Sequence, residues 1–191
     1  MSDTKEVYRT AEVMLSESGA NLLETSLFSD VTVNCGDRTW KLHKAITCSR
    51  CPYFNKAFNG HFKEAATGDL TIKEQIPEYV DQAIRYLYTG KAPEDTLESW
   101  PIDLFKVADF LQIKSLERQS IETIKTRLRE VMGFLADIHN KPKEAQMEKA
   151  FPDFIYLART AYGADSASYY RLRDISKRFF AQIKQHIIND D

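Results

Sequence analysis

The residues best suited to chemistry in this chain are two cysteines that lie three positions apart. Cys48 and Cys51 form a Cys-x-x-Cys pair, and His43 and His61 flank this pair in the sequence. Two thiolates and two imidazoles are a ligand set for zinc, and a Cys-x-x-Cys pair at a helix start is also a redox motif. A third hypothesis makes Cys51 a nucleophile with His61 as its base.

The surroundings of the two cysteines favour a structural role for both. Cys48 and Cys51 lie between two short predicted helices beside an aromatic face, where a cysteine commonly acts as a small buried hydrophobe. A redox pair is expected after a strand in a βαβ unit, and a nucleophile needs an oxyanion hole and an orienting acid at a recognisable spacing. We therefore predict no catalytic, cofactor-binding or metal-binding residues, and keep a Cys48/Cys51 thiol or zinc function as a distant alternative.

A polar pair, Asp30 and His43, stands at the two ends of a predicted β-hairpin. Residues 31–35 (Val-Thr-Val-Asn-Cys) alternate strictly between apolar and polar side chains, and Gly36-Asp37 suits a two-residue turn. The hairpin register could bring Asp30 and His43 together, so that the carboxylate holds the imidazole. Two interpretations stay open here, a structural pair and a partner-peptide groove polarised by the pair.

Helical spacing predicts most of the remaining chain. Residues 7–27 form a predicted helix with a potential interruption at Ser18-Gly19-Ala20-Asn21. Pro52 and Pro77 suit the first positions of two further helices. Later helices lead to a break at residues 140–143 (Asn-Lys-Pro-Lys), beyond which two more helices are expected.

Composition and charge exclude several classes of partner. The 191 residues carry 26 Lys and Arg against 28 Asp and Glu, so the chain lacks the basic excess that nucleic-acid binding requires. We predict that the basic residues of the last helix form a solvated face. They are Arg171, Arg173, Lys177, Arg178 and Lys184. No apolar stretch is long enough to span a membrane, the N-terminus lacks an apolar signal core, and three cysteines do not form a disulfide framework. We therefore expect no nucleic-acid or membrane partner and a cytoplasmic or nuclear location.

Six motifs in a fixed order suggest a family. They are Phe28-Ser29-Asp30-Val31-Thr32-Val33, Trp40-Lys41-Leu42-His43-Lys44-Ala45, Ser49-Arg50-Cys51-Pro52-Tyr53-Phe54, Phe62-Lys63-Glu64, Tyr86-Leu87-Tyr88-Thr89-Gly90 and Ala108-Asp109-Phe110. This set resembles the BTB/POZ domain, a protein–protein interaction module, and its turn and loop sequences look most like fungal members with a helical tail that includes a Leu172-Arg173-Asp174 motif. The resemblance implies an α+β fold, a small β-sheet capped by helical hairpins, followed by a C-terminal all-helical extension. The expected division is an N-terminal helical segment at 1–26, the BTB/POZ domain at 27–125 and the extension at 126–191.

The resemblance also implies self-association. Members of the family dimerise largely through the helix before the hairpin and the first helical pair, so the helix at residues 7–27 is the candidate dimer surface. Its apolar residues there are Met14, Leu15, Leu22, Leu23 and Leu27. The same residues also suit packing on the domain's own core. In the family, the positions of Asp30 and His43 lie at a groove between the two subunits.

A cullin is the second partner that the resemblance implies. Many family members are substrate adaptors of cullin-RING ubiquitin ligases, and their contact is a hydrophobic residue, any residue, then glutamate. Phe62-Lys63-Glu64 matches that motif in type and place, with Phe62 as an apolar anchor and Glu64 as an acceptor of charge-assisted hydrogen bonds. The alternative is that Phe62 packs inward and Glu64 is a solvated loop charge. The sequence carries no separate substrate-binding domain, so an unknown client protein would bind the residues after Pro142 or the BTB surface. We predict a non-enzymatic homodimeric scaffold or adaptor, with cullin adaptor as the alternative.

Overall fold

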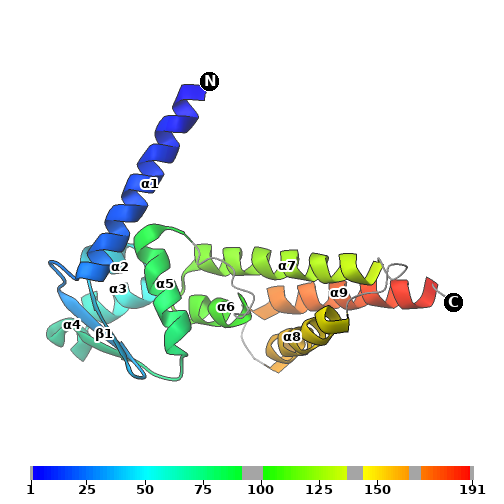
Figure 1. Cartoon of the computed structure of the whole chain (residues 1–191). Coiled ribbons are helices and arrows are strands. Elements are labelled where there is room, and N and C mark those ends of the chain that lie inside the picture. The colour runs from blue at the N-terminus through cyan, green and yellow to red at the C-terminus, as the bar shows by residue number, and fades with distance from the viewer. Residues whose placement is uncertain (1, 92–100, 137–143, 164–168, 190–191) are drawn as a thin grey trace. The chain divides into compact units, whose positions relative to one another are not determined.

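The computed structural model describes residues 2–91, 101–136, 144–163 and 169–189 (Figure 1). It divides into two compact units. The first unit comprises Met1–Glu94 and Asp103–Glu117, and the second comprises Asp95–Ile102 and Arg118–Asp191. The two units are described separately below.

A three-stranded sheet forms the centre of the first unit. The strands β1 (Val31–Cys35), β2 (Arg38–Leu42) and β3 (Asp69–Ile72) lie in the order β2-β1-β3. β1 and β2 form the predicted antiparallel hairpin, and Gly36 in its turn adopts a left-handed φ of 57°. β3 runs parallel to β1 on the other side. The apolar residues of β1 are buried, which confirms the alternation seen in the sequence.

Helices surround this sheet. Up to residue 110 they are α1 (Ser2–Thr25), α2 (Lys44–Arg50), α3 (Pro52–Asn59), α4 (Lys63–Thr67), α5 (Pro77–Thr89) and α6 (Pro101–Phe110). The predicted helix starts at Pro52 and Pro77 are confirmed, and Gly90 ends α5 in the left-handed conformation. Two expectations were wrong. α1 continues through Gly19 without interruption, and the segment after Phe62 is a short helix rather than a loop.

The core of the first unit lies between the sheet and these helices. Its largest fully buried side chains include two phenylalanines of α3 and two apolar residues of α5. They are Phe54, Phe58, Ile84 and Leu87. The aromatic face predicted on α3 is therefore a packing face, and burying each of these side chains contributes about 1.5–3 kcal/mol.

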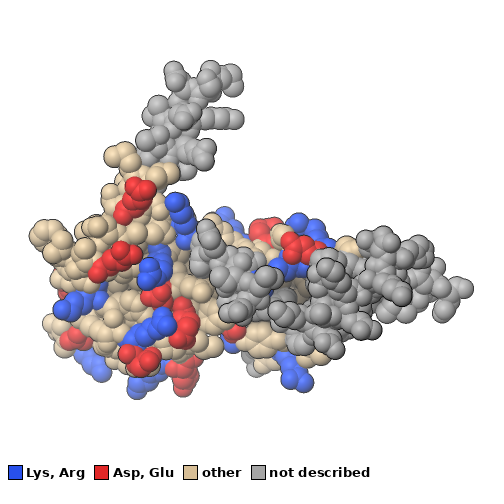
Figure 2. All heavy atoms as spheres, in the orientation of Figure 1, with Lys and Arg blue, Asp and Glu red and all other residues tan. Residues whose placement is uncertain are grey.

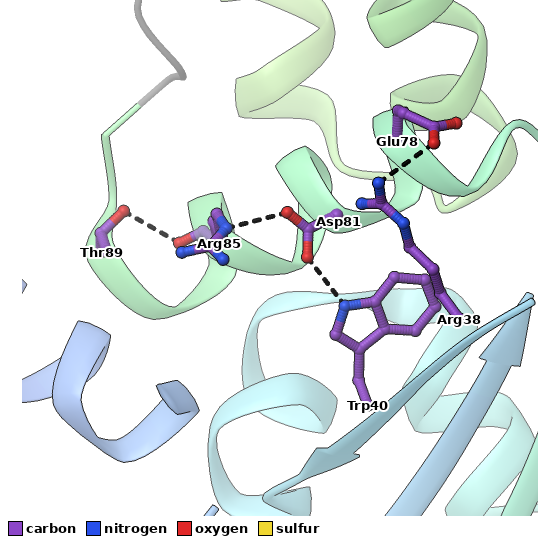
Figure 3. A network of polar contacts seen from close by, with 6 residues as sticks. All are labelled: Arg38, Trp40, Glu78, Asp81, Arg85 and Thr89. Atoms are coloured by element: carbon purple, nitrogen blue, oxygen red, sulfur yellow. Dashed lines mark hydrogen bonds and ion pairs between the residues drawn. The ribbon is translucent and has the colours of Figure 1, made fainter. Parts of the chain in front are cut away.

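A line of polar contacts ties α5 to the edge strand β2 (Figure 3). The Trp40 indole N–H donates to the Asp81 carboxylate at 2.8 Å, and Asp81 also pairs with Arg85 at 2.8 Å. Arg38 of β2 pairs with Glu78 at 3.1 Å in an exposed contact that contributes little stability. The view in Figure 2 shows acidic and basic side chains interspersed over the first unit. The Trp40–Asp81 and Arg38–Glu78 contacts therefore hold α5 against β2.

The second unit is helical. α7 (Lys114–Ala136) begins in the first unit and continues into the second, which also contains α8 (Glu144–Gly163) and α9 (Tyr170–Asn189). The Phe154 ring of α8 contacts Phe179 and Phe180 of α9 at centroid distances of 4.8 and 4.5 Å. Towards the other end of the pair, the Arg173 guanidinium donates to the Ala161 carbonyl at 3.3 Å. α8 and α9 are thus an antiparallel helical pair.

These elements confirm the α+β class with a C-terminal helical extension. The predicted break at residues 140–143 lies outside the described residues, and the predicted boundary at 125/126 stays a prediction. Among the residues that the structure describes, none of the helices has the length and apolar character needed to cross a membrane.

Candidate interaction surfaces

The C-terminal half of α1 is part of the first unit's fold. α1 packs against α5, and at the crossing a Cβ on Gly19 would overlap the backbone carbonyl oxygen of Tyr88. Leu22 and Leu23 are partly buried against the hydrophobic core. Glycine at this position therefore permits a close approach of two helices, and the leucines that follow it fix α1 on the domain.

The residues before Gly19 are different, because large apolar side chains project from the helix. Met14 is 62% exposed and Leu15 is 73% exposed, and Val13 beside them is also exposed. The candidate dimer surface therefore divides in two. Met14, Leu15 and Leu27 are exposed, whereas Leu22 and Leu23 pack on the domain itself. The role of this set in dimerisation stays a prediction.

A groove of about 790 Å³ lies beside the exposed part of α1. α1, α2, the end of α5 and the start of α7 line it, and its apolar lining includes Leu15, Leu22 and Ile46. Arg50 and Lys91 supply positive charge, and none of its lining residues in the described structure is acidic. Arg50 also donates to the Leu87 carbonyl at the C-terminal end of α5. The groove thus offers apolar surface next to the projecting residues.

His43 is buried and holds the segment that follows α1. Its Nε2 lies 2.6 Å from the Leu27 carbonyl oxygen, and its Nδ1 lies 2.8 Å from the Tyr88 hydroxyl. Because a carbonyl can only accept, Nε2 carries the proton and Nδ1 accepts from Tyr88. The His43 backbone N–H also donates to the Tyr88 hydroxyl at 2.9 Å. Burial raises the pKa of Tyr88 to about 12, because the phenolate would lose its hydration.

Asp30 has a different task from the predicted one. Its carboxylate accepts the backbone N–H of Lys44 at 2.8 Å, at the first residue of α2. Both imidazole nitrogens of His43 have the partners described above, so the expectation that Asp30 holds the ring was wrong. Asp30 instead accepts the first backbone N–H of α2, the helix whose N-cap residue is His43. Their place in a groove between subunits stays a prediction.

The turn between α1 and β1 exposes Phe28, which belongs to a family motif but was not predicted to lie on an interaction surface. Ser26 and Phe28 adopt left-handed backbone conformations, with φ of 55° and 63°. Phe28 is 89% exposed, and Leu27 beside it is also exposed while its carbonyl is held by His43. A left-handed φ is uncommon for a bulky residue, and no sequence pattern indicates it. The turn therefore presents two apolar side chains next to α1.

Phe62 and Glu64 lie at the start of α4. Phe62 occupies the N-cap position and is 63% exposed, so it does not pack inward. Glu64 is half-buried in the first turn of α4. Burial raises the pKa of the Tyr53 hydroxyl, and the negative charge of Glu64 raises this pKa further. The alternative in which Phe62 is a core residue is therefore wrong, and an exposed aromatic stands two residues before a carboxylate.

Cys48 and Cys51 contact backbone carbonyls. The Cys51 thiol is buried and lies 3.2 Å from the Leu111 carbonyl oxygen, and the half-buried Cys48 thiol lies 3.7 Å from the Phe54 carbonyl oxygen. Burial raises the pKa of Cys51 to about 11, which opposes formation of the thiolate that a nucleophile or metal ligand needs. Among the described side chains, no three of the His, Cys, Asp or Glu type are grouped so as to hold a metal ion.

Comparison with known proteins gives a consistent result. The family model of the BTB/POZ domain matches residues 20–128. The chain is 28% identical over 134 residues to TD and POZ domain-containing protein 1 of Mus musculus, covering 68% of this chain and 37% of that protein. It therefore spans little more than a third of the curated relative's length. Among solved structures, the BTB domain of zebrafish PATZ1 is similar in fold, with a TM-score of 0.51 and 23% identity over 62% of this chain and 94% of that chain.

Proposed function

This chain belongs to the BTB/POZ domain family of protein–protein interaction modules, and we propose that it forms a homodimer through α1. In this proposal the dimer acts as a scaffold or adaptor and has no catalytic step. The expected cytoplasmic or nuclear location and the likeness to fungal members stay predictions. The proposal has its main support in one surface of the first unit.

That surface combines projecting apolar side chains with an apolar groove beside them. Met14 and Leu15 project from α1, and Leu15 also lines the groove next to Leu22 and Ile46. Two copies related by a two-fold axis would each offer the same side chains and the same groove, as an isologous interface requires. Burying these exposed side chains on the partner removes apolar surface from water, which favours association.

Molar mass in solution tests the dimer. We expect the wild-type chain to be dimeric by light scattering after size exclusion, and the double variant Met14→Glu/Leu15→Glu to be monomeric, because two carboxylates would be buried at the interface. Ile76→Glu is the matched control, since Ile76 is also exposed in the first unit but lies at the start of α5. A monomeric wild type, or a double variant that remains dimeric, would contradict the proposal.

A cullin is a second candidate partner, supported by the exposure of Phe62. The Phe62 ring is 63% exposed, so it is suited to insertion into a pocket of a partner protein. Glu64, in the same helical turn, would accept charge-assisted hydrogen bonds at the edge of that contact. We propose that these two residues carry the contact in a cullin-RING ubiquitin ligase.

Calorimetry with the N-terminal domain of the cullin that binds BTB domains tests this second proposal. We expect heat of binding with wild type, and none with Phe62→Ala or with Glu64→Lys. Lys63→Ala is the matched control, because Lys63 lies between these two residues, where the family motif accepts any side chain. The absence of heat with a well-folded wild-type dimer would exclude the cullin, as would binding that survives both substitutions.

A further inference from the structure

The last helix has a strong charge imbalance. α9 contains five Lys or Arg residues and one Asp, whereas the whole chain has slightly more acidic than basic residues. The single carboxylate, Asp174, pairs with Arg178 at 3.0 Å. One carboxylate cannot neutralise five cations, so α9 itself remains strongly positive. Lys177 and Lys184 are both exposed.

Exposed apolar residues accompany these cations. In the described part of the second unit, the large hydrophobic residues that are exposed all lie on α8 and α9. They are Ile155, Tyr162, Tyr170 and Phe180. Phe180 lies where the two helices meet, because its ring contacts Phe154 at 4.5 Å, yet it remains 49% exposed. A half-exposed aromatic at such a contact leaves apolar surface that neither helix covers.

The spacing places both kinds of residue on the same faces. On α9, Tyr170, Lys177 and Lys184 are seven residues apart, so they follow one line along the helix. On α8, Ile155, Arg159 and Tyr162 follow an i, i+4, i+7 pattern and are all exposed. Each helix therefore presents apolar and basic side chains together. We name the four exposed apolar residues together with Arg159, Lys177 and Lys184 the α8–α9 face.

We infer that the α8–α9 face binds a segment of a client protein in which carboxylates alternate with large apolar side chains. This inference rests on the proposed function, because it supplies the client site of the adaptor. Carboxylates of the segment would pair with Lys177, Lys184 and Arg159, which fixes orientation and speeds encounter. Its apolar side chains would cover Phe180 and Ile155 and so supply most of the affinity.

A protein segment fits this face better than a nucleic acid does. Phosphate-backbone binding relies on a dense basic surface, whereas the cations of the α8–α9 face are separated by apolar side chains. The sequence-based expectation of a simple solvated face does not account for four large apolar residues that are exposed beside the charges.

The test uses the full chain and a synthetic peptide pool. Peptides in which Glu or Asp alternates with Leu or Phe are passed over the immobilised chain, beside a second pool with Lys in place of every carboxylate. We expect selective retention of the acidic pool, and anisotropy of labelled retained peptides should show affinity that falls as salt rises. Lys177→Glu/Lys184→Glu should weaken binding about tenfold or more, and Phe180→Ser should weaken it at all salt concentrations.

Matched controls separate the possible outcomes. Lys73→Glu, an exposed charge reversal after β3 in the first unit, should leave peptide affinity unchanged. The molar mass of each sample is measured in parallel, so loss of the dimer and loss of peptide binding are distinguished. Equal retention of both pools, or unchanged affinity in Lys177→Glu/Lys184→Glu, would overturn the inference. Tighter α9-dependent binding to single-stranded RNA or to anionic lipid vesicles would overturn it as well.

Discussion

The two halves of α1 serve different purposes although they belong to one continuous helix. From Gly19 onward the helix is fixed on the first unit, with glycine against the Tyr88 carbonyl and two leucines on the core. Before Gly19 the apolar side chains of Met14 and Leu15 project. The second half of the helix is therefore part of the fold, whereas the first half exposes apolar side chains to solvent. A substitution should affect stability or association according to its position.

Tyr88 is the residue that fixes the packed half. Its carbonyl lies against Gly19, and its hydroxyl binds His43, whose ring in turn holds the Leu27 carbonyl just after the helix ends. One tyrosine thus secures α1 directly through its backbone and the segment after α1 through a histidine. The predictions below test this division, from the largest expected effect to the smallest.

Gly19→Ala should cause the largest loss of stability. The added Cβ would overlap the Tyr88 carbonyl, so one of the two backbones must move, at a cost of about 3 kcal/mol in the free energy of unfolding. Urea denaturation monitored by circular dichroism measures this change in the free energy of unfolding. Gly133→Ala is the control, because a Cβ there meets nothing within 4 Å in the last turn of α7, and this substitution should not destabilise the chain. Equal effects of the two substitutions would remove the evidence for a close crossing.

Tyr88→Phe should destabilise the chain by about 2 kcal/mol. It keeps the ring but leaves the His43 backbone N–H and Nδ1 without the hydroxyl that they bind in the buried site. Chemical denaturation measures the change. Tyr86→Phe, two residues earlier on α5 and only partly buried, should change stability by less than about 0.5 kcal/mol. An unchanged free energy of unfolding in Tyr88→Phe would show that the hydrogen bonds between His43 and the Tyr88 hydroxyl do not contribute to stability.

Alkaline pH should lower the stability of the first unit, in which Tyr88 and Cys51 are both buried. Burial raises the pKa of Tyr88 from 10 to about 12 and that of Cys51 from 9 to about 11, so the folded chain keeps protons that the unfolded chain releases. The stability is therefore fully present below pH 9 and falls progressively as the pH rises towards 12. Denaturation curves at increasing pH measure this fall, which should be smaller in Tyr88→Phe. Stability that rose above pH 9 would contradict both assignments.

Met14→Glu/Leu15→Glu should have the smallest effect on the monomer. Both side chains are exposed, so the free energy of unfolding at protein concentrations below dimer formation should change by less than about 0.5 kcal/mol. At higher concentrations the wild type should gain stability from association and the variant should not. Denaturation at several protein concentrations makes the comparison. A large loss in dilute solution would mean that the projecting half is also part of the fold.

Local patterns made much of the fold predictable from the sequence. The alternation from Val31 to Cys35 and the Gly36-Asp37 turn specify the hairpin, because a strand places successive side chains on opposite faces. Pro52, Pro77 and Gly90 mark helix ends for conformational reasons that act within a few residues. The six ordered motifs then identified the family.

Contacts between distant residues were not predictable in this way. Gly19 suggested a helix interruption, but glycine is needed at this position because a side chain would overlap the carbonyl oxygen of Tyr88, which is distant in the sequence. The ring nitrogens of His43 are bound by Tyr88 and Leu27, whereas the hairpin register suggested Asp30. Leu22 and Leu27 share a sequence pattern, but α1 ends at Thr25, so Leu22 is partly buried on the core whereas Leu27 lies exposed in the turn that follows.

The arrangement of the three strands also has a consequence for how the chain folds. β1 meets β2 across a two-residue turn, but it meets β3 only after the helices in residues 43–68 have been placed, which closes a much longer loop. The hairpin should therefore form early and the parallel pairing late. In refolding kinetics, Val31→Ala should mainly slow folding and Leu70→Ala should mainly speed unfolding. The reverse pattern would place β3 in the folding nucleus.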